Sequence, residues 1–154
     1  MRAVLLAPAL VSALLVAGCS GGKEAEVQKA AEAGVQVTDA RLVLPIVKDN
    51  PGAVYFNLVN ASDAAKKVTS IDVVGTDMAM IHDTVDKDGK STMVMLHEVA
   101  VPAKATVIFA PGGRHVMVMG IKPELKAGAT AELKVNFEGG DVLAATIPVT
   151  AGGN

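Results

Sequence analysis

The sequence is poor in cysteine and in aromatic residues, and both shortages restrict what the protein can do. Cys19 is the single cysteine among 154 residues, and there are no tryptophans, one tyrosine and three phenylalanines. The chain beyond Cys19 therefore offers no disulfide and no thiolate metal ligand. A formal charge of -2 without a basic cluster, and the scarcity of rings that could stack on bases, argue against nucleic acid as a partner.

The usual signals of enzyme chemistry are also missing. Ser, His and Asp all occur, but the sequence has no nucleophile elbow and no pair of carboxylates spaced for acid-base catalysis. About half of the residues are apolar, which is enough for one compact domain with a core of its own. We therefore expect a binding protein and not an enzyme.

The N-terminus has the pattern of an export signal. Residues 1–18 combine one Arg, an apolar run and small residues before Cys19, which is typical of a secretory signal peptide and not of a membrane span. The sequence Leu15-Val16-Ala17-Gly18-Cys19 resembles the bacterial lipobox, which implies cleavage before Cys19 and its lipidation. An ordinary cleaved signal with an incidental cysteine is the alternative.

The lipobox implies a place in the bacterial cell envelope. We expect a lipid-anchored protein at the periplasmic face, and Ser20 resembles the residue that follows the cysteine in lipoproteins of the outer membrane. Residues 19–34 are small, charged and rich in Ala, without an apolar stripe that demands burial. They are predicted to be the lipidated Cys and a flexible tether.

Residues 35–150 are predicted to form one all-β domain. Short runs rich in Val, Ile, Leu and Thr alternate with Gly, Pro, Asn and Asp at roughly the ten-residue spacing of a sandwich or barrel. The prolines between the runs, and turn sequences such as Asp88-Gly89, agree with this pattern. About nine strands are expected, near 35–44, 53–60, 66–74, 78–85, 92–99, 105–110, 115–121, 130–137 and 142–149.

Two histidines and two methionines within this domain are spaced as one metal site. If Asp88-Gly89 is a two-residue hairpin turn, His82 lies opposite Met95, and Met93 becomes a diagonal neighbour of His82 on the same face. His115 and Met117 are two residues apart on a predicted strand, so they also share a face. Imidazole and soft, neutral thioether ligands favour copper(I) over hard cations. The spacing does not show whether the two pairs meet.

Each methionine also has a simpler interpretation, because Met often fills gaps in a core. We expect Met, with Val, Ala and Leu, to fill the core, and we interpret Met78, Met80, Met95 and Met119 as half-buried strand residues. His97 lies outside the pattern and is predicted to be a surface or packing residue. A β-sandwich interaction domain whose Met and His are all core residues stays an alternative.

The pattern of His82, ten residues, Met93, twenty-one residues and His115-x-Met117 resembles the signature of the PCuAC family of periplasmic copper chaperones. The resemblance covers roughly residues 35–149 and includes Pro111-Gly112-Gly113 before the second His. It implies a cupredoxin-like Greek-key β-barrel or sandwich that binds one copper(I) per chain. Met80 and Met119 would lie beside the ligands. Arg114 departs from the aromatic or aliphatic residue expected there and would also lie close to them.

The resemblance implies that the protein delivers copper(I) to a cytochrome c oxidase subunit at the CuA site, or to a copper assembly protein. Sequestration of copper in the envelope, with the same site, is the alternative. A blue-copper electron carrier is disfavoured, because such centres need a Cys thiolate beside their histidines and the domain has none.

Overall fold

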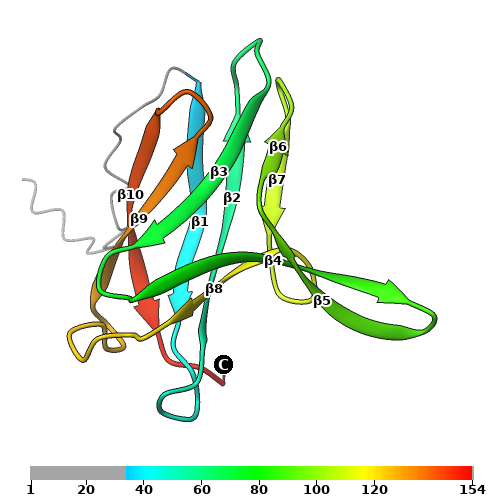
Figure 1. The fold of residues 1–154 in the computed structure, drawn as a ribbon. Coiled ribbons are helices and arrows are strands. Elements are labelled where there is room, and N and C mark those ends of the chain that lie inside the picture. The colour runs from blue at the N-terminus through cyan, green and yellow to red at the C-terminus, as the bar shows by residue number, and fades with distance from the viewer. Residues whose placement is uncertain (1–33, 154) are drawn as a thin grey trace, which may run out of the picture.

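The computed structural model describes residues 34–153, and the regular structure in this range is entirely β-strand (Figure 1). The expected signal peptide, Cys19 and all of the expected tether except Gly34 lie outside the described residues. The all-β class is confirmed. The ten strands are β1 (Val35–Val43), β2 (Gly52–Asn60), β3 (Lys66–Val73), β4 (Met78–Lys87), β5 (Lys90–Leu96), β6 (Val99–Val101), β7 (Thr106–Phe109), β8 (His115–Met119), β9 (Thr130–Phe137) and β10 (Val142–Thr150).

The tenth strand arises because the run expected at 92–99 is divided between two partners. β5 ends at Leu96 and pairs with β4, whereas β6 begins at Val99 and pairs with β3. The chain leaves one layer and enters the other at His97 and Glu98, and a strand cannot continue through that crossing. One expected run therefore corresponds to two strands, with the break at the polar residues His97 and Glu98.

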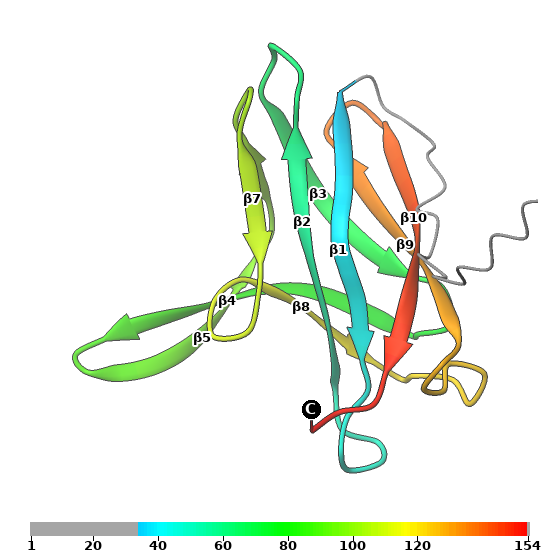
Figure 2. The same cartoon turned by 180° about the vertical axis from the view of Figure 1, so that it is seen from behind.

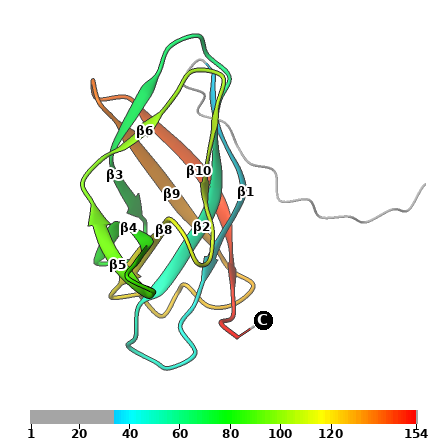
Figure 3. The same cartoon turned by 90° about the vertical axis from the view of Figure 1, so that its right-hand side faces the viewer.

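The strands form two layers that are joined along one side. Their hydrogen-bonded order is β5-β4-β8-β2-β1-β10-β9-β3-β6, with β7 also paired to β2. The layers meet through a short parallel contact between β1 and β10, and the sheet does not close on itself. Figure 2 shows β1 and β2 in front of β3, and Figure 3 gives the same arrangement from the side.

The core lies between the layers and is built from alternating strand residues. In β2 every second residue is buried, and Phe56 stacks on Phe109 of β7 with ring centroids 4.2 Å apart. The buried hydrophobic cluster consists of Val, Leu, Ile, Phe and Ala, and contains no methionine from the part of the chain that the structure describes. The expectation that Met helps to fill the core is therefore wrong.

One buried polar side chain ties the loops at one end of the sandwich. Asn60, at the end of β2, is 1% exposed. Its Nδ2 donates to the carbonyl oxygens of Ala64, Val101 and Pro102 at 2.8–3.1 Å, and its Oδ1 accepts from the amide and hydroxyl of Ser62. All of its hydrogen-bonding capacity is used, which explains how an amide is tolerated at this depth.

The β4–β5 hairpin is an arm that extends from the side of the molecule away from β9 and β10 (Figures 1 and 2). Asp88 and Gly89 form its two-residue turn with φ values of 53° and 72°. Positive φ at both positions defines a type I′ turn, which matches the twist of the strands. The predicted register is confirmed, with His82 opposite Met95 and Thr84 opposite Met93.

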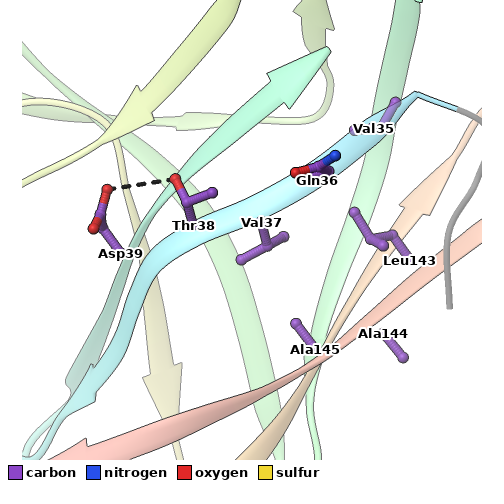
Figure 4. Close-up of a pocket in the computed structure, with 8 residues that line it drawn as sticks. All are labelled: Val35, Gln36, Val37, Thr38, Asp39, Leu143, Ala144 and Ala145. Atoms are coloured by element: carbon purple, nitrogen blue, oxygen red, sulfur yellow. Dashed lines mark hydrogen bonds between the residues drawn. The ribbon is translucent and has the colours of Figure 1, made fainter. Parts of the chain in front are cut away.

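A crevice of about 310 Å³ lies where β1 and β10 diverge (Figure 4). The two strands pair only at Leu42 and Val43, and a bulge near Asp39, where φ is 53°, turns the start of β1 away. Val, Leu and Ala side chains line the crevice together with Gln36, Thr38 and Asp39, and it contains no His or Met. It is thus separate from the predicted metal site. Within residues 34–153 there is no helix with the length and apolar character needed to span a membrane.

Candidate metal centre

The pairing of β4 with β8 brings the two predicted ligand pairs together. These antiparallel strands place His82 directly opposite His115. The two imidazole rings have centroids 6.0 Å apart and planes inclined by 24°. Because β5 lies on the other side of β4, His82 is the central residue of a row that runs from Met95 through His82 to His115.

Each of the two imidazoles has a ring nitrogen that can bind a metal ion. His115 Nδ1 lies 2.9 Å from the carbonyl oxygen of Gly113, so a proton on Nδ1 is donated to that oxygen and Nε2 keeps its lone pair. His82 Nδ1 is buried and has no hydrogen-bond partner in the described structure. Buried polar atoms nearly always have a partner, and a metal ion is one way to supply it.

The two predicted thioether ligands lie on either side of the histidine pair. Met117 shares the outer face of β8 with His115 and is half-buried opposite Met80. Met93 lies on the arm, opposite Thr84 and diagonal to His82, and its side chain is 56% exposed. The inner face of the same strands carries Ile81, Val116 and Val118, which are buried in the core. Because successive strand residues point to opposite faces, the predicted ligands lie on the outer face of β4 and β8 and the core residues lie on the inner face.

The remaining methionines on this face are more exposed than the sequence suggested. Met78, Met95 and Met119 are 53%, 49% and 41% exposed and lie outside the hydrophobic core, so the simpler interpretation as packing residues is wrong for these three. Met95 is directly opposite His82 and so lies beside the centre, which sequence reasoning did not assign to it. The hairpin register predicted from the Asp88-Gly89 turn already places Met95 opposite His82, so the sequence did indicate that Met95 lies close to the histidine.

Comparison with known proteins identifies the family of this chain. The family model described as "Putative lipoprotein LpqE-like" matches residues 35–149. The chain belongs to the LpqE-like family. It is 30% identical over 151 residues to "Putative lipoprotein Lxx21020" of Leifsonia xyli subsp. xyli (strain CTCB07), an alignment that covers 94% of this chain and 89% of the relative.

Solved structures of PCuAC domains share the fold of this LpqE-like protein. The copper-bound PCuAC domain from PmoF2 aligns with a TM-score of 0.63 at 19% identity, covering 77% of this chain and 93% of that domain. The solution structure of copper(I)-bound DR1885 from Deinococcus radiodurans aligns with a TM-score of 0.61 at 28% identity, covering 79% of this chain and 83% of that one. The predicted PCuAC resemblance and the cupredoxin-like β fold are confirmed.

Arg114 of this LpqE-like chain points away from the histidine pair. It precedes His115 and therefore takes the opposite face, where its Nη2 lies 3.3 Å from Asp83 Oδ2 and its guanidinium lies over the Phe109 ring at 5.9 Å. Its charge is thus paired with a carboxylate. His97 is exposed, as expected, just beyond the end of β5.

The donor set of this centre is soft. Between residues 34 and 153, no three His, Cys, Asp or Glu side chains come together in a way that could hold a metal ion. The cluster is a metal centre only if thioether sulfur supplies part of the coordination. Neutral sulfur combined with imidazole suits copper(I) and does not suit calcium or magnesium, which require oxygen ligands.

Proposed function

We propose that this protein binds one copper(I) ion as cargo through His82, Met93, His115 and Met117, and passes it to a partner by ligand exchange. The observation that carries this proposal is the cross-strand pair of His82 and His115, with Met117 on the same face of β8 and Met93 diagonal to His82 across the hairpin. No reaction is catalysed. The similarity to copper(I)-bound DR1885 supports the same ion here.

The distance between the rings suits one shared ion. With metal–nitrogen bonds of about 2 Å, taking zinc as a guide, each ring centroid lies about 3 Å from the ion, so two rings on one ion have centroids up to about 6 Å apart. The observed separation is 6.0 Å. A small movement of either ring would bend the N–metal–N angle and leave room for Met117 and Met93.

The exposure of the ligands favours transfer over permanent storage. His82, His115 and Met117 are half-buried, whereas Met93 is 56% exposed at the base of the arm. A neutral thioether on an exposed strand can be displaced by a ligand of the partner without burying an uncompensated charge. Exchange would therefore begin at Met93.

The expected anchor defines where this transfer takes place. Lipidation of Cys19, which the lipoprotein description of the family supports, would hold the domain at the periplasmic face of the envelope. The receiving partner would be a cytochrome c oxidase subunit at its CuA site or a copper assembly protein. Sequestration of copper in the envelope uses the same ligands and differs only in the partner.

A copper(I) competition titration tests the site. It uses the full chain with Cys19→Ser, which removes the only thiol, in detergent under anaerobic reducing conditions. We expect one tight equivalent, weakened at least about 100-fold by His82→Ala or Met117→Ala, since even the loss of partners outside the coordination shell costs 10–100-fold. His97→Ala is the matched control and should bind like the parent. Binding that both ligand substitutions leave unchanged would overturn the proposal.

Gene deletion separates delivery from sequestration. Loss of oxidase activity that added copper restores would support delivery to the CuA site. Sensitivity to copper with normal oxidase activity would support sequestration.

A further inference from the structure

The histidine pair is one end of a longer ladder of metal-binding side chains. Along the outer face of β4 and β8, the next pair of opposite residues is Met80 with Met117, and the pair after it is Met78 with Met119. Three successive pairs therefore present two imidazoles and four thioethers on one surface. Only Met117 of these four thioethers belongs to the site proposed above.

The outermost pair has no packing role that would explain it. Met78 and Met119 are 53% and 41% exposed, and neither belongs to the hydrophobic core or to the partly buried residues packed against it. Six of the seven methionines in the sequence lie between residues 78 and 119, whereas the core is made of other apolar residues. Methionine is thus concentrated on the ligand face and not where it would fill gaps.

We infer that Met78 and Met119 form a second, sulfur-only site for copper(I), through which the ion reaches or leaves the histidine pair. The inference rests on the proposed copper function and adds a second binding position to it. The ion bound at this pair would be a soft monovalent cation such as copper(I), because hard cations do not bind neutral thioethers well.

The geometry of the pair permits such a site. Directly opposite residues of antiparallel strands have Cβ atoms about 4.5–5.5 Å apart. Two thioether sulfurs on one ion, each about 2.3 Å from it by analogy with zinc–sulfur bonds, are separated by at most about 4.6 Å. Parallel side chains from Met78 and Met119 meet this condition with little adjustment.

The two positions are distinct but connected. Met78 is four residues from His82 along β4, which is about 13 Å at the rise of an extended strand. This distance is too long for Met78 or Met119 to bind an ion held by the histidines. Met80 and Met117 lie between them, about 7 Å from each end, and provide the intermediate ligands for a stepwise transfer.

The test follows each methionine separately by NMR of the full Cys19→Ser chain labelled with ¹³C at the Met methyl groups. Silver(I) serves as a redox-inert probe of copper(I) sites. We expect the first equivalent to shift Met93 and Met117, and the second to shift Met78 and Met119 together. Met78→Leu should abolish the shift of Met119 and weaken the second equivalent at least tenfold, while Met95→Leu should leave it unchanged.

Three results would overturn the inference: no second equivalent, a second equivalent that shifts Met95 but not Met78, or a Met119 response that survives Met78→Leu. The second result would instead assign the ion to the cavity of about 170 Å³ that Met80, Met95 and His97 line.

A His82→Ala, His115→Ala double variant separates this inference from the proposed function. In that variant the Met78–Met119 response should persist. A chain that shows this response, but never binds an ion at the histidines, would overturn the proposed function alone. Histidine-dependent binding without a Met78–Met119 response would overturn the second site alone.

Discussion

His115 lies directly opposite His82 in the β4–β8 pair, with their ring centroids 6.0 Å apart. This one relationship turns two separate sequence motifs into a single centre. The strands that carry it are anchored from the inner face, where Ile81, Val116 and Val118 are buried. Core packing on the inner face therefore positions the imidazoles, and the outer face remains available to bind and release a metal ion.

Copper(I) affinity should fall steeply as the pH is lowered from 7.5 to 5. Both imidazoles must be neutral to bind, because a protonated ring nitrogen has no lone pair to give to the metal, so metal binding competes with protons. The measurement is competition against a chelator of known affinity at each pH. Equal affinity at both values would contradict coordination by two histidines.

Silver(I) binding at the Met78–Met119 pair should respond differently to pH. Thioethers do not titrate in this range, so the NMR shift of these two residues in the His82→Ala, His115→Ala variant should be the same at pH 5 and pH 7.5. A tenfold loss between these values would mean that a titrating group shares the site.

Met93→Leu should weaken copper(I) binding at least about tenfold without destabilising the fold. The side chain is 56% exposed on the arm, and a surface change of similar volume usually alters the free energy of unfolding by less than about 0.5 kcal/mol. Ile81→Ala, on the buried face of the neighbouring strand, is the contrasting variant and should cost about 2–5 kcal/mol. Urea unfolding and copper titration of both variants would distinguish ligand loss from misfolding.

Arg114→Met should lower stability by about 1 kcal/mol and leave copper(I) affinity within about twofold of the parent. The guanidinium pairs with partly exposed Asp83, and ion pairs of this kind contribute modestly. Arg114 lies on the face opposite His115, so its charge does not enter the centre. A large change in affinity would show that Arg114 acts on the ligands after all.

Asn60→Ala should destabilise the domain by about 2–4 kcal/mol, because it leaves the buried carbonyl of Val101 and the partly buried carbonyls of Ala64 and Pro102 without the donor that Asn60 supplies. Asn57→Ala is the matched control. That amide makes one exposed hydrogen bond, to Asp39, and its loss should cost less than about 1 kcal/mol. Similar losses in thermal unfolding for both variants would contradict the role assigned to Asn60.

The sequence by itself determined the all-β class and the geometry of the hairpin arm. Asp88-Gly89 is a two-residue turn whose positive φ values define the register, so the positions of Met93 and Met95 relative to His82 follow from local chemistry. Alternation along β8 likewise placed His115 and Met117 on one face.

Only the tertiary structure decided that β8 lies beside β4, because their pairing joins segments distant in the sequence and depends on burying Ile81, Val116 and Val118 against the second layer. The same packing decided which face of each strand meets solvent. It left Met78, Met95 and Met119 exposed and turned Arg114 toward Asp83. A period of two identifies residues that share a face, but it does not say which face the core will cover.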